Sequence, residues 1–161
     1  MLLLIAALPV FAACQRISLS FDAQQDFSGY KTFVIASGQL NSKSPSLNNE
    51  IVQKQVGEDI RRSLTQKGLT EVQGQPDLNV RWSLGSGRHV EEEAYPAGWN
   101  GTRVVRRRYT EGTLILDLRD AKRRVLVFRA IAVVDDSDPL RIKDRLDDMV
   151  RKAAEKYPPK K

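Results

Sequence analysis

The sequence has 161 residues and a mass of 18.2 kDa, which suits one compact domain with a hydrophobic core and is too short for two ordinary domains. Hydrophobic residues make up 41% and charged residues 29%, proportions that exclude a disordered chain. The net charge of +6 favours anionic partners such as phospholipid head groups, lipopolysaccharide, acidic glycans or nucleic acid. Charge by itself does not choose among them.

An uncharged apolar segment opens the chain and ends at its single cysteine, Cys14. The segment is shorter than the roughly 20 residues of a membrane-spanning helix. It does not suit a buried core helix either, because Pro9 would break the helix and no polar face is present. Residues 1–13 therefore predict an export signal peptide, and 14–161 a single exported domain.

Residues 11–14, Phe-Ala-Ala-Cys, resemble the lipobox of bacterial lipoproteins. The resemblance implies that the Cys14 thiol is lipidated and that cleavage occurs just before it. Phe11 stands where Leu is usual, and no basic residue follows Met1, which indicates that translation starts upstream. The alternative is cleavage near Ala12 or Ala13, which would release a soluble periplasmic protein with an exposed thiol, an unfavourable group in an oxidising compartment.

Acyl chains would hold the domain on the membrane without inserting it, at about 0.8 kcal/mol per buried methylene. Gln15 follows the cysteine, where an Asp would act as the inner-membrane retention signal in enterobacteria-like sorting. We therefore expect an outer-membrane lipoprotein, palmitate-bearing, whose domain faces the periplasm.

Two strands are predicted at the start of the mature chain. Apolar residues alternate with polar ones over 17–21, and a second strand covers 31–35 after turn residues at 26–30. Residues 37–49 are rich in Ser, Asn, Gly and Pro and predict a surface loop.

An amphipathic helix is predicted from about residue 47 to residue 67, with Asn48 or Asn49 as its cap and Gly68 at its C-terminal end. Its apolar residues recur every four positions. They are Val52, Val56, Ile60 and Leu64.

The second half of the chain predicts three further strands and a closing helix. A strand with one core face spans 78–84, and a hairpin pairs 109–118 with 125–134 through a polar turn. Residues 85–103 show neither periodicity and predict a long mobile hairpin loop. The closing helix spans 142–157. The predicted fold is α+β: a mostly antiparallel sheet with two amphipathic helices packed on one face.

Several segments resemble the bacterial lipoproteins grouped as domain-of-unknown-function family 4136. The segments span nearly the whole mature chain and are residues 26–33 (DFSGYKTF), 67–69 (KGL), 76–80 (PDLNV), 112–118 (GTLILDL), 127–130 (VFRA) and 157–159 (YPP). Phe128 and Ala130 replace an expected Trp and Gly. The resemblance implies a periplasm-facing lipoprotein with a helix-covered sheet, and it supplies no catalytic residue. Phe27 and Tyr30 are interpreted as packing residues around a turn, and Pro76 and Asp77 as the entrance of a strand.

The residue types of a metal centre or a nucleophilic enzyme are scarce. His89 is the only histidine and Cys14 the only cysteine, so we predict no metal and no cofactor. The acidic run 91–93 is interpreted as a solvated surface. Asp117 and Asp120 lie beside basic residues that would keep them ionised, and we interpret them as turn and ion-pair residues rather than general acids.

A group of arginines and aromatic residues is the candidate binding site. The group consists of Trp99, Arg103, Arg106, Arg107, Arg108 and Tyr109. Such a cationic surface would suit an anionic glycan or lipid. The alternative is that the arginines pair with the acidic residues 91–93 across the same loop.

The sequence predicts a lipid-anchored, non-enzymatic envelope protein, a binding or assembly module that docks an envelope protein, an anionic glycan or a lipid. The protein-partner version uses a half-apolar outer sheet face, formed by Ile115, Val127, Ile131 and Val133. The alternative is a periplasmic enzyme acting on a glycan or phosphoester through Asp117, Asp120 and His89. A nucleic-acid partner is not expected because the chain is exported.

Overall fold

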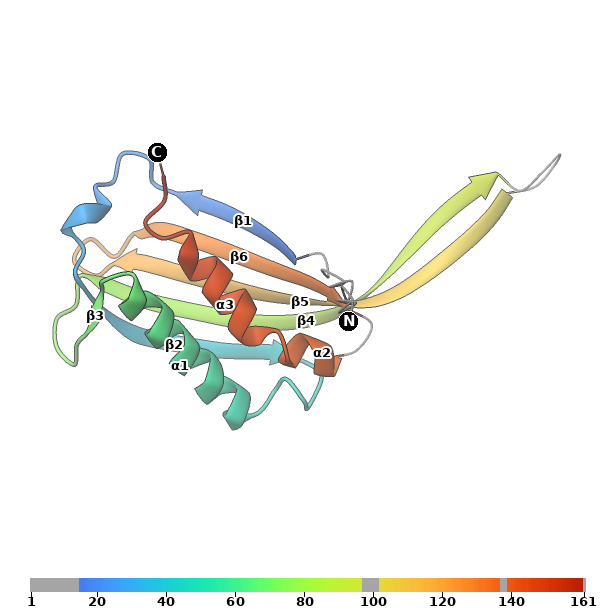
Figure 1. The fold of residues 1–161 in the computed structure, drawn as a ribbon, viewed down its shortest axis with the longest axis horizontal. Coiled ribbons are helices and arrows are strands. Elements are labelled where there is room, and N and C mark those ends of the chain that lie inside the picture. Colours follow the sequence, from blue (N-terminus) through green and yellow to red (C-terminus); the bar gives the residue numbers. More distant parts are fainter. Residues whose placement is uncertain (1–14, 97–101, 137–138, 161) are drawn as a thin grey trace, which may run out of the picture.

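The computed structural model describes residues 15–96, 102–136 and 139–160, and for 88–96, 102–111 and 139 it describes the backbone alone. A six-stranded sheet carries helices on one face (Figure 1), so the predicted α+β class is confirmed. The strands are β1 (Gln15–Phe21), β2 (Thr32–Ser42), β3 (Thr70–Glu71), β4 (Leu78–Pro96), β5 (Thr102–Asp120) and β6 (Leu126–Asp136). Their order across the sheet is β1-β6-β5-β4-β2-β3.

The sheet is mixed. β1, β6, β5 and β4 pair antiparallel, as predicted, whereas β2 pairs parallel with both β4 and β3. The parallel pairing follows from the connection, because helix α1 (Glu50–Gln66) carries the chain from the end of β2 back to the start of β4.

The α1 helix begins and ends close to the predicted residues. Asn49 is the cap, with its side chain accepting a hydrogen bond from the Val52 N–H, and Gly68 adopts a φ of 85° after the last turn. The stripe of Val52, Val56, Ile60 and Leu64 is fully buried. These are the outcomes that the four-residue repeat predicted.

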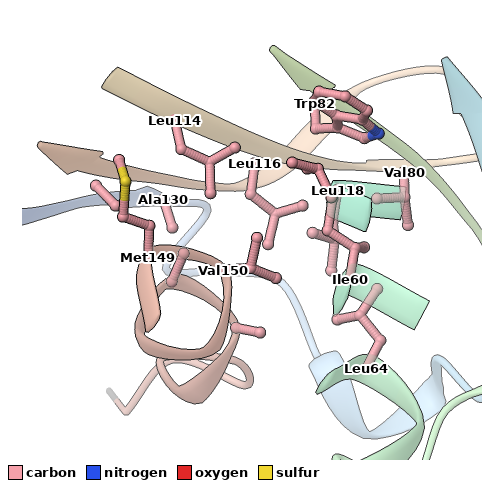
Figure 2. Packing of buried hydrophobic residues seen from close by; sticks show 14 of the residues in the cluster. Ile60, Leu64, Val80, Trp82, Leu114, Leu116, Leu118, Ala130, Met149 and Val150 are labelled. Carbon is pink, nitrogen blue, oxygen red and sulfur yellow. The ribbon is translucent and has the colours of Figure 1, made fainter. Parts of the chain in front are cut away.

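The predicted closing helix is two helices, α2 (Pro139–Lys143) and α3 (Leu146–Glu155), with Asp144 and Arg145 between them. Buried residues on α3 include Leu146, Met149 and Val150. Figure 2 shows Met149 and Val150 beside the inward-facing leucines of β5, with Ile60 and Leu64 of α1 close by. Alternation on the strands and the helical repeat thus meet in one core.

Two loop predictions are wrong. β2 continues through residues 37–42, which the composition assigned to a surface loop, because these residues pair with β4 as far as Ser42 and Ser86. Residues 85–96 and 102–103, predicted as a mobile loop, continue β4 and β5 in unbroken antiparallel register to Pro96 and Thr102. Figure 1 shows the distal part of this hairpin extending beyond the other strands. Pairing of main-chain groups, which needs no hydrophobic period, sustains both extensions.

The outer sheet face is smaller than predicted. Ile115, Ile131 and Val133 are half-buried on it, but Val127 is 1% exposed and belongs to the core. The register explains the error: Leu118 is opposite Phe128 and Arg119 is opposite Leu126, so Val127 is an extra residue at a bulge. A bulge interrupts the alternation on which the prediction depended.

Candidate functional site

A polar pocket lies at the end of the sheet where β2 and β4 begin and β5 ends. Its volume is about 610 Å³, within the range of pockets that hold small molecules. The segment before β2, the loop before β4 and the turn after β5 contribute its walls. Six of the lining residues carry the argument below: Tyr30, Gln75, Asp77, Asn79, Asp120 and Lys122. We call it the end pocket.

Asp77 joins the start of β4 to the start of β2. Its Oδ2 atom accepts hydrogen bonds from the N–H groups of Lys31 and Thr32 and from Thr32 Oγ1, each at 2.9 Å. The Asp77 N–H in turn donates to Thr32 Oγ1 at 2.9 Å. Hydrogen bonds from the Lys31 main chain, the Thr32 side chain and the Thr32 main chain lower the pKa of Asp77, so it is a carboxylate at neutral pH.

Asp120 is the second carboxylate and is 8% exposed. Its Oδ1 atom accepts from the Arg123 N–H at 2.7 Å, and Oδ2 accepts from the Tyr30 hydroxyl at 2.8 Å and from Arg123 Nε at 3.0 Å. Burial raises the pKa of Asp120, but these hydrogen bonds and the Arg123 charge outweigh burial and lower it. Burial and the neighbouring Asp120 raise the pKa of Tyr30, which therefore stays protonated and donates.

An aromatic cluster holds Tyr30 in place. The Phe27 ring lies edge-on to Tyr30 at a centroid distance of 6.2 Å and edge-on to Tyr157 at 5.8 Å. Tyr157 also meets Phe128 edge-on at 5.6 Å. Phe27 belongs to the short 3-10 helix η1 (Phe27–Gly29), whose cap is the Asp26 side chain accepting from the Ser28 N–H. The predicted packing role of Phe27 and Tyr30 is confirmed, and the Tyr30 wall of the pocket is rigid.

Other lining groups remain available to a ligand. Within the described residues, the side chains of Gln75, Asn79 and Lys122 make no hydrogen bond, and Asp77 Oδ1 accepts none. The pocket thus combines carboxylates engaged in the fold with amide and ammonium groups that a ligand could bind. This division suits recognition more than proton transfer, because both engaged carboxylates have lowered pKa values.

The candidate binding site from the sequence lies apart from the end pocket. The backbone of Arg103, Arg106, Arg107, Arg108 and Tyr109 belongs to β5, but their side chains, and Trp99 altogether, lie outside the described residues. The register sets Arg107 opposite Glu91 and Arg106 opposite Glu92, an arrangement compatible with the alternative of charge pairing. Cys14 also lies outside the described residues.

Asp117 and Asp120 are ion-pair residues, as predicted. Arg129 Nε and Nη2 bind the two Asp117 oxygens at 2.6 Å each, across the β5–β6 pair. Within the described part of the chain, no group of three or more potential metal ligands is present. None of the helices described is both long enough and apolar enough to cross a membrane.

The end pocket itself was not predicted. Tyr30, Asp77 and Asp120 were each given a local structural role, and the structure brings them to one site. A usable signal was present, because two of the segments behind the family resemblance, 26–33 and 76–80, both place polar residues where strands begin. Parallel strands that begin side by side bring such residues together.

These features describe a helix-covered mixed sheet with a polar pocket at one end. The profile of the family described as "Domain of unknown function (DUF4136)" matches residues 17–159. The chain belongs to this family. No curated protein matches the sequence.

Solved structures share the fold at low sequence identity. A DUF4136 family protein from Bacteroides thetaiotaomicron is 15% identical with a TM-score of 0.58, covering 89% of this chain and 96% of that one. A PDZ domain protein from Parabacteroides distasonis is 16% identical with a TM-score of 0.60, covering 92% of this chain, which spans only 38% of the PDZ protein. A PelC dodecamer from Paraburkholderia phytofirmans is 11% identical with a TM-score of 0.51, covering 87% and 94%. At these identities the likeness concerns the fold alone.

Proposed function

We propose that the protein is a lipid-anchored, non-enzymatic binding module of the bacterial cell envelope, which presents its end pocket away from the membrane. The proposal combines the lipobox-like segment ending at Cys14 with one structural observation. The folded domain begins at the next residue, Gln15, and the pocket lies at the opposite end of the sheet.

The start of β1 is firmly part of the fold. Gln15 is the Cα partner of Val134 in the β1–β6 pair, and its Oε1 atom accepts a hydrogen bond from Lys152 Nζ of α3 at 2.7 Å. A lipid on Cys14 would therefore hold the domain close to the bilayer without a linker. Because a rigid strand follows the anchor, the anchor would also restrict the orientation of the domain.

The end pocket would then face away from the bilayer. β1 runs from Gln15 opposite Val134 to Phe21 opposite Phe128, and the pocket lies beyond the Phe21 end. Its seven residues span about 20 Å at the usual rise of a strand. A pocket at that distance from the anchor is accessible to envelope components in the periplasm. Gln15 after the cysteine supports the outer membrane as the location.

Binding is a better account of the pocket than catalysis. Asp77 and Asp120 are held ionised by hydrogen bonds that also hold the fold together, and Tyr30 is held protonated. A general acid or base works best with a pKa near the working pH. The lowered pKa values of both carboxylates favour a binding module over the alternative of a glycan- or phosphoester-cleaving enzyme.

Metabolic labelling tests the anchor. The full chain and its Cys14→Ser variant are expressed in a Gram-negative host with an alkyne analogue of palmitate, and membranes are separated by density. We expect label and outer-membrane fractionation for the unchanged chain, and loss of both for Cys14→Ser. A parallel pair with two lysines inserted after Met1 supplies the basic residues that export signals use.

The control is Ser18→Ala, an exposed β1 position that should leave labelling unchanged. Absence of label in the unchanged chain, with and without the inserted lysines, would overturn the proposal. So would equal membrane retention of Cys14→Ser.

A further inference from the structure

We infer that the end pocket binds a neutral, hydroxyl-rich ligand, a short saccharide segment. The inference rests on the proposed function only in treating the pocket as a binding site, and it does not depend on the lipid anchor. It goes against the expectation from net charge, which favoured an anionic partner.

The charges around the pocket disfavour an anion. Asp26, Asp77 and Asp120 line it, and Lys122 is the only cationic residue lining it among the residues described. The nearby Arg123 guanidinium is already engaged, with Nε bonded to Asp120 Oδ2 at 3.0 Å. A phosphate or uronate group would meet ionised carboxylates that the fold holds in place, so the basic character of the whole chain does not extend to this pocket.

A strongly cationic ligand is disfavoured for a different reason. Asp120 is neutralised by Arg123, and Asp77 Oδ2 is saturated by three hydrogen bonds from Lys31 and Thr32. Lys122 would also repel a polyamine. The remaining charge balance is close to neutral, and it leaves hydrogen bonding as the means of selecting a ligand.

The available hydrogen-bonding groups match hydroxyls. The Gln75 and Asn79 amides each offer donors and an acceptor, Lys122 offers donors, and Asp77 Oδ1 offers an acceptor. A hydroxyl both donates and accepts, so neighbouring ring hydroxyls can use amide and carboxylate groups together. An apolar ligand would leave these groups without partners, which is unfavourable.

The pocket also has an apolar wall against which the C–H face of a sugar ring can lie. The Tyr30 ring, Pro76 and Ala121 contribute to it. Tyr30 is held from two sides, by the Phe27 ring and by its hydrogen bond to Asp120. A wall that is already ordered lowers the entropic cost of binding. The volume of about 610 Å³ exceeds the need of a single small molecule fragment and suits a few linked rings.

Titration calorimetry with defined probes tests the ligand class. The full chain, purified in detergent micelles, is titrated with chitotetraose, cellotetraose and maltotetraose, and separately with tetragalacturonate and spermidine. We expect at least one neutral tetrasaccharide to bind and the charged probes to bind more weakly. Gln75→Ala and Asn79→Ala should each weaken that binding about tenfold, the effect of one lost hydrogen bond of roughly 1.4 kcal/mol.

Two variants are matched controls. Gln73→Ala changes an exposed amide two residues from Gln75 that does not line the end pocket, and Lys43→Met changes an exposed lysine at the opposite end of β2, against Lys122→Met in the pocket. The controls should bind as the unchanged chain does. The pocket side chains changed here make no hydrogen bond within the described residues, so the variants should fold.

The outcomes separate the two proposals. No binding of any neutral tetrasaccharide, or equal binding by the pocket variants and the controls, would overturn the saccharide inference. Tighter binding of tetragalacturonate or spermidine that Asn79→Ala abolishes would overturn the ligand class while supporting a binding pocket. The palmitate result bears on the anchor alone.

Discussion

The Tyr30 hydroxyl donates a hydrogen bond of 2.8 Å to Asp120 Oδ2, joining residues 90 positions apart in the sequence. The bond ties the segment before β2 to the turn after β5. It also sets the aromatic wall of the end pocket beside its buried carboxylate. Two strand ends that are not neighbours in the sheet are thereby held together.

Tyr30→Phe should destabilise the protein by about 1–2 kcal/mol, because a charge-accepting bond is lost and Asp120 keeps fewer partners. Urea unfolding followed by circular dichroism measures the difference. An unchanged unfolding midpoint would show that the bond contributes nothing to the fold.

Tyr157→Phe should have the opposite sign. The Tyr157 side chain is 3% exposed, burial raises its pKa, and its hydroxyl has no hydrogen-bond partner among the described residues. Removing an unpaired buried hydroxyl while keeping the edge-on ring contacts should stabilise the fold by about 1 kcal/mol. The same urea experiment applies, and a loss of stability would contradict the prediction.

Acid should weaken the fold through Asp77 and Asp120. Hydrogen bonds from the Lys31 and Thr32 main chains and side chain lower the pKa of Asp77 below its ordinary 3.8, and those from Arg123 and Tyr30 outweigh burial at Asp120. A lowered folded-state pKa means that the stability is present above the ordinary value and is lost as pH falls through the folded-state values.

The free energy of unfolding should therefore be nearly level above about pH 5 and decline below about pH 4. Asp77→Asn should lower stability at neutral pH and flatten this decline. Asp144→Asn, at an exposed position with no side-chain hydrogen bond, is the control and should retain the decline. An equally steep decline in Asp77→Asn would contradict the assignment.

Gly38→Ala should destabilise the protein by about 1–3 kcal/mol, the usual cost of overpacking. A Cβ atom at Gly38 would overlap the indole of Trp82, which is 4% exposed on the neighbouring strand β4. Trp82 would have to move, so its fluorescence should change together with the unfolding midpoint. Gly74→Ala is the control, because a Cβ atom there meets nothing within 4 Å.

Much of the core could be predicted from sequence because its pattern is local. The four-residue repeat of α1 and the alternation of Leu114, Leu116 and Leu118 each place apolar side chains on one face without reference to the rest of the chain. The bulge at Val127 and the break between α2 and α3 escaped prediction, since one residue of register changes the face of a side chain.

The sequence by itself determined the α+β class, the buried stripe of α1 and the positions of Asn49 and Gly68 at its ends, because side-chain periodicity and capping act over a few residues. Only the tertiary structure decided that β2 pairs parallel with β4, and so that Tyr30, Asp77 and Asp120 share a pocket. Main-chain pairing of polar strands leaves no hydrophobic period in the sequence, and hydrogen bonds between distant residues depend on that pairing.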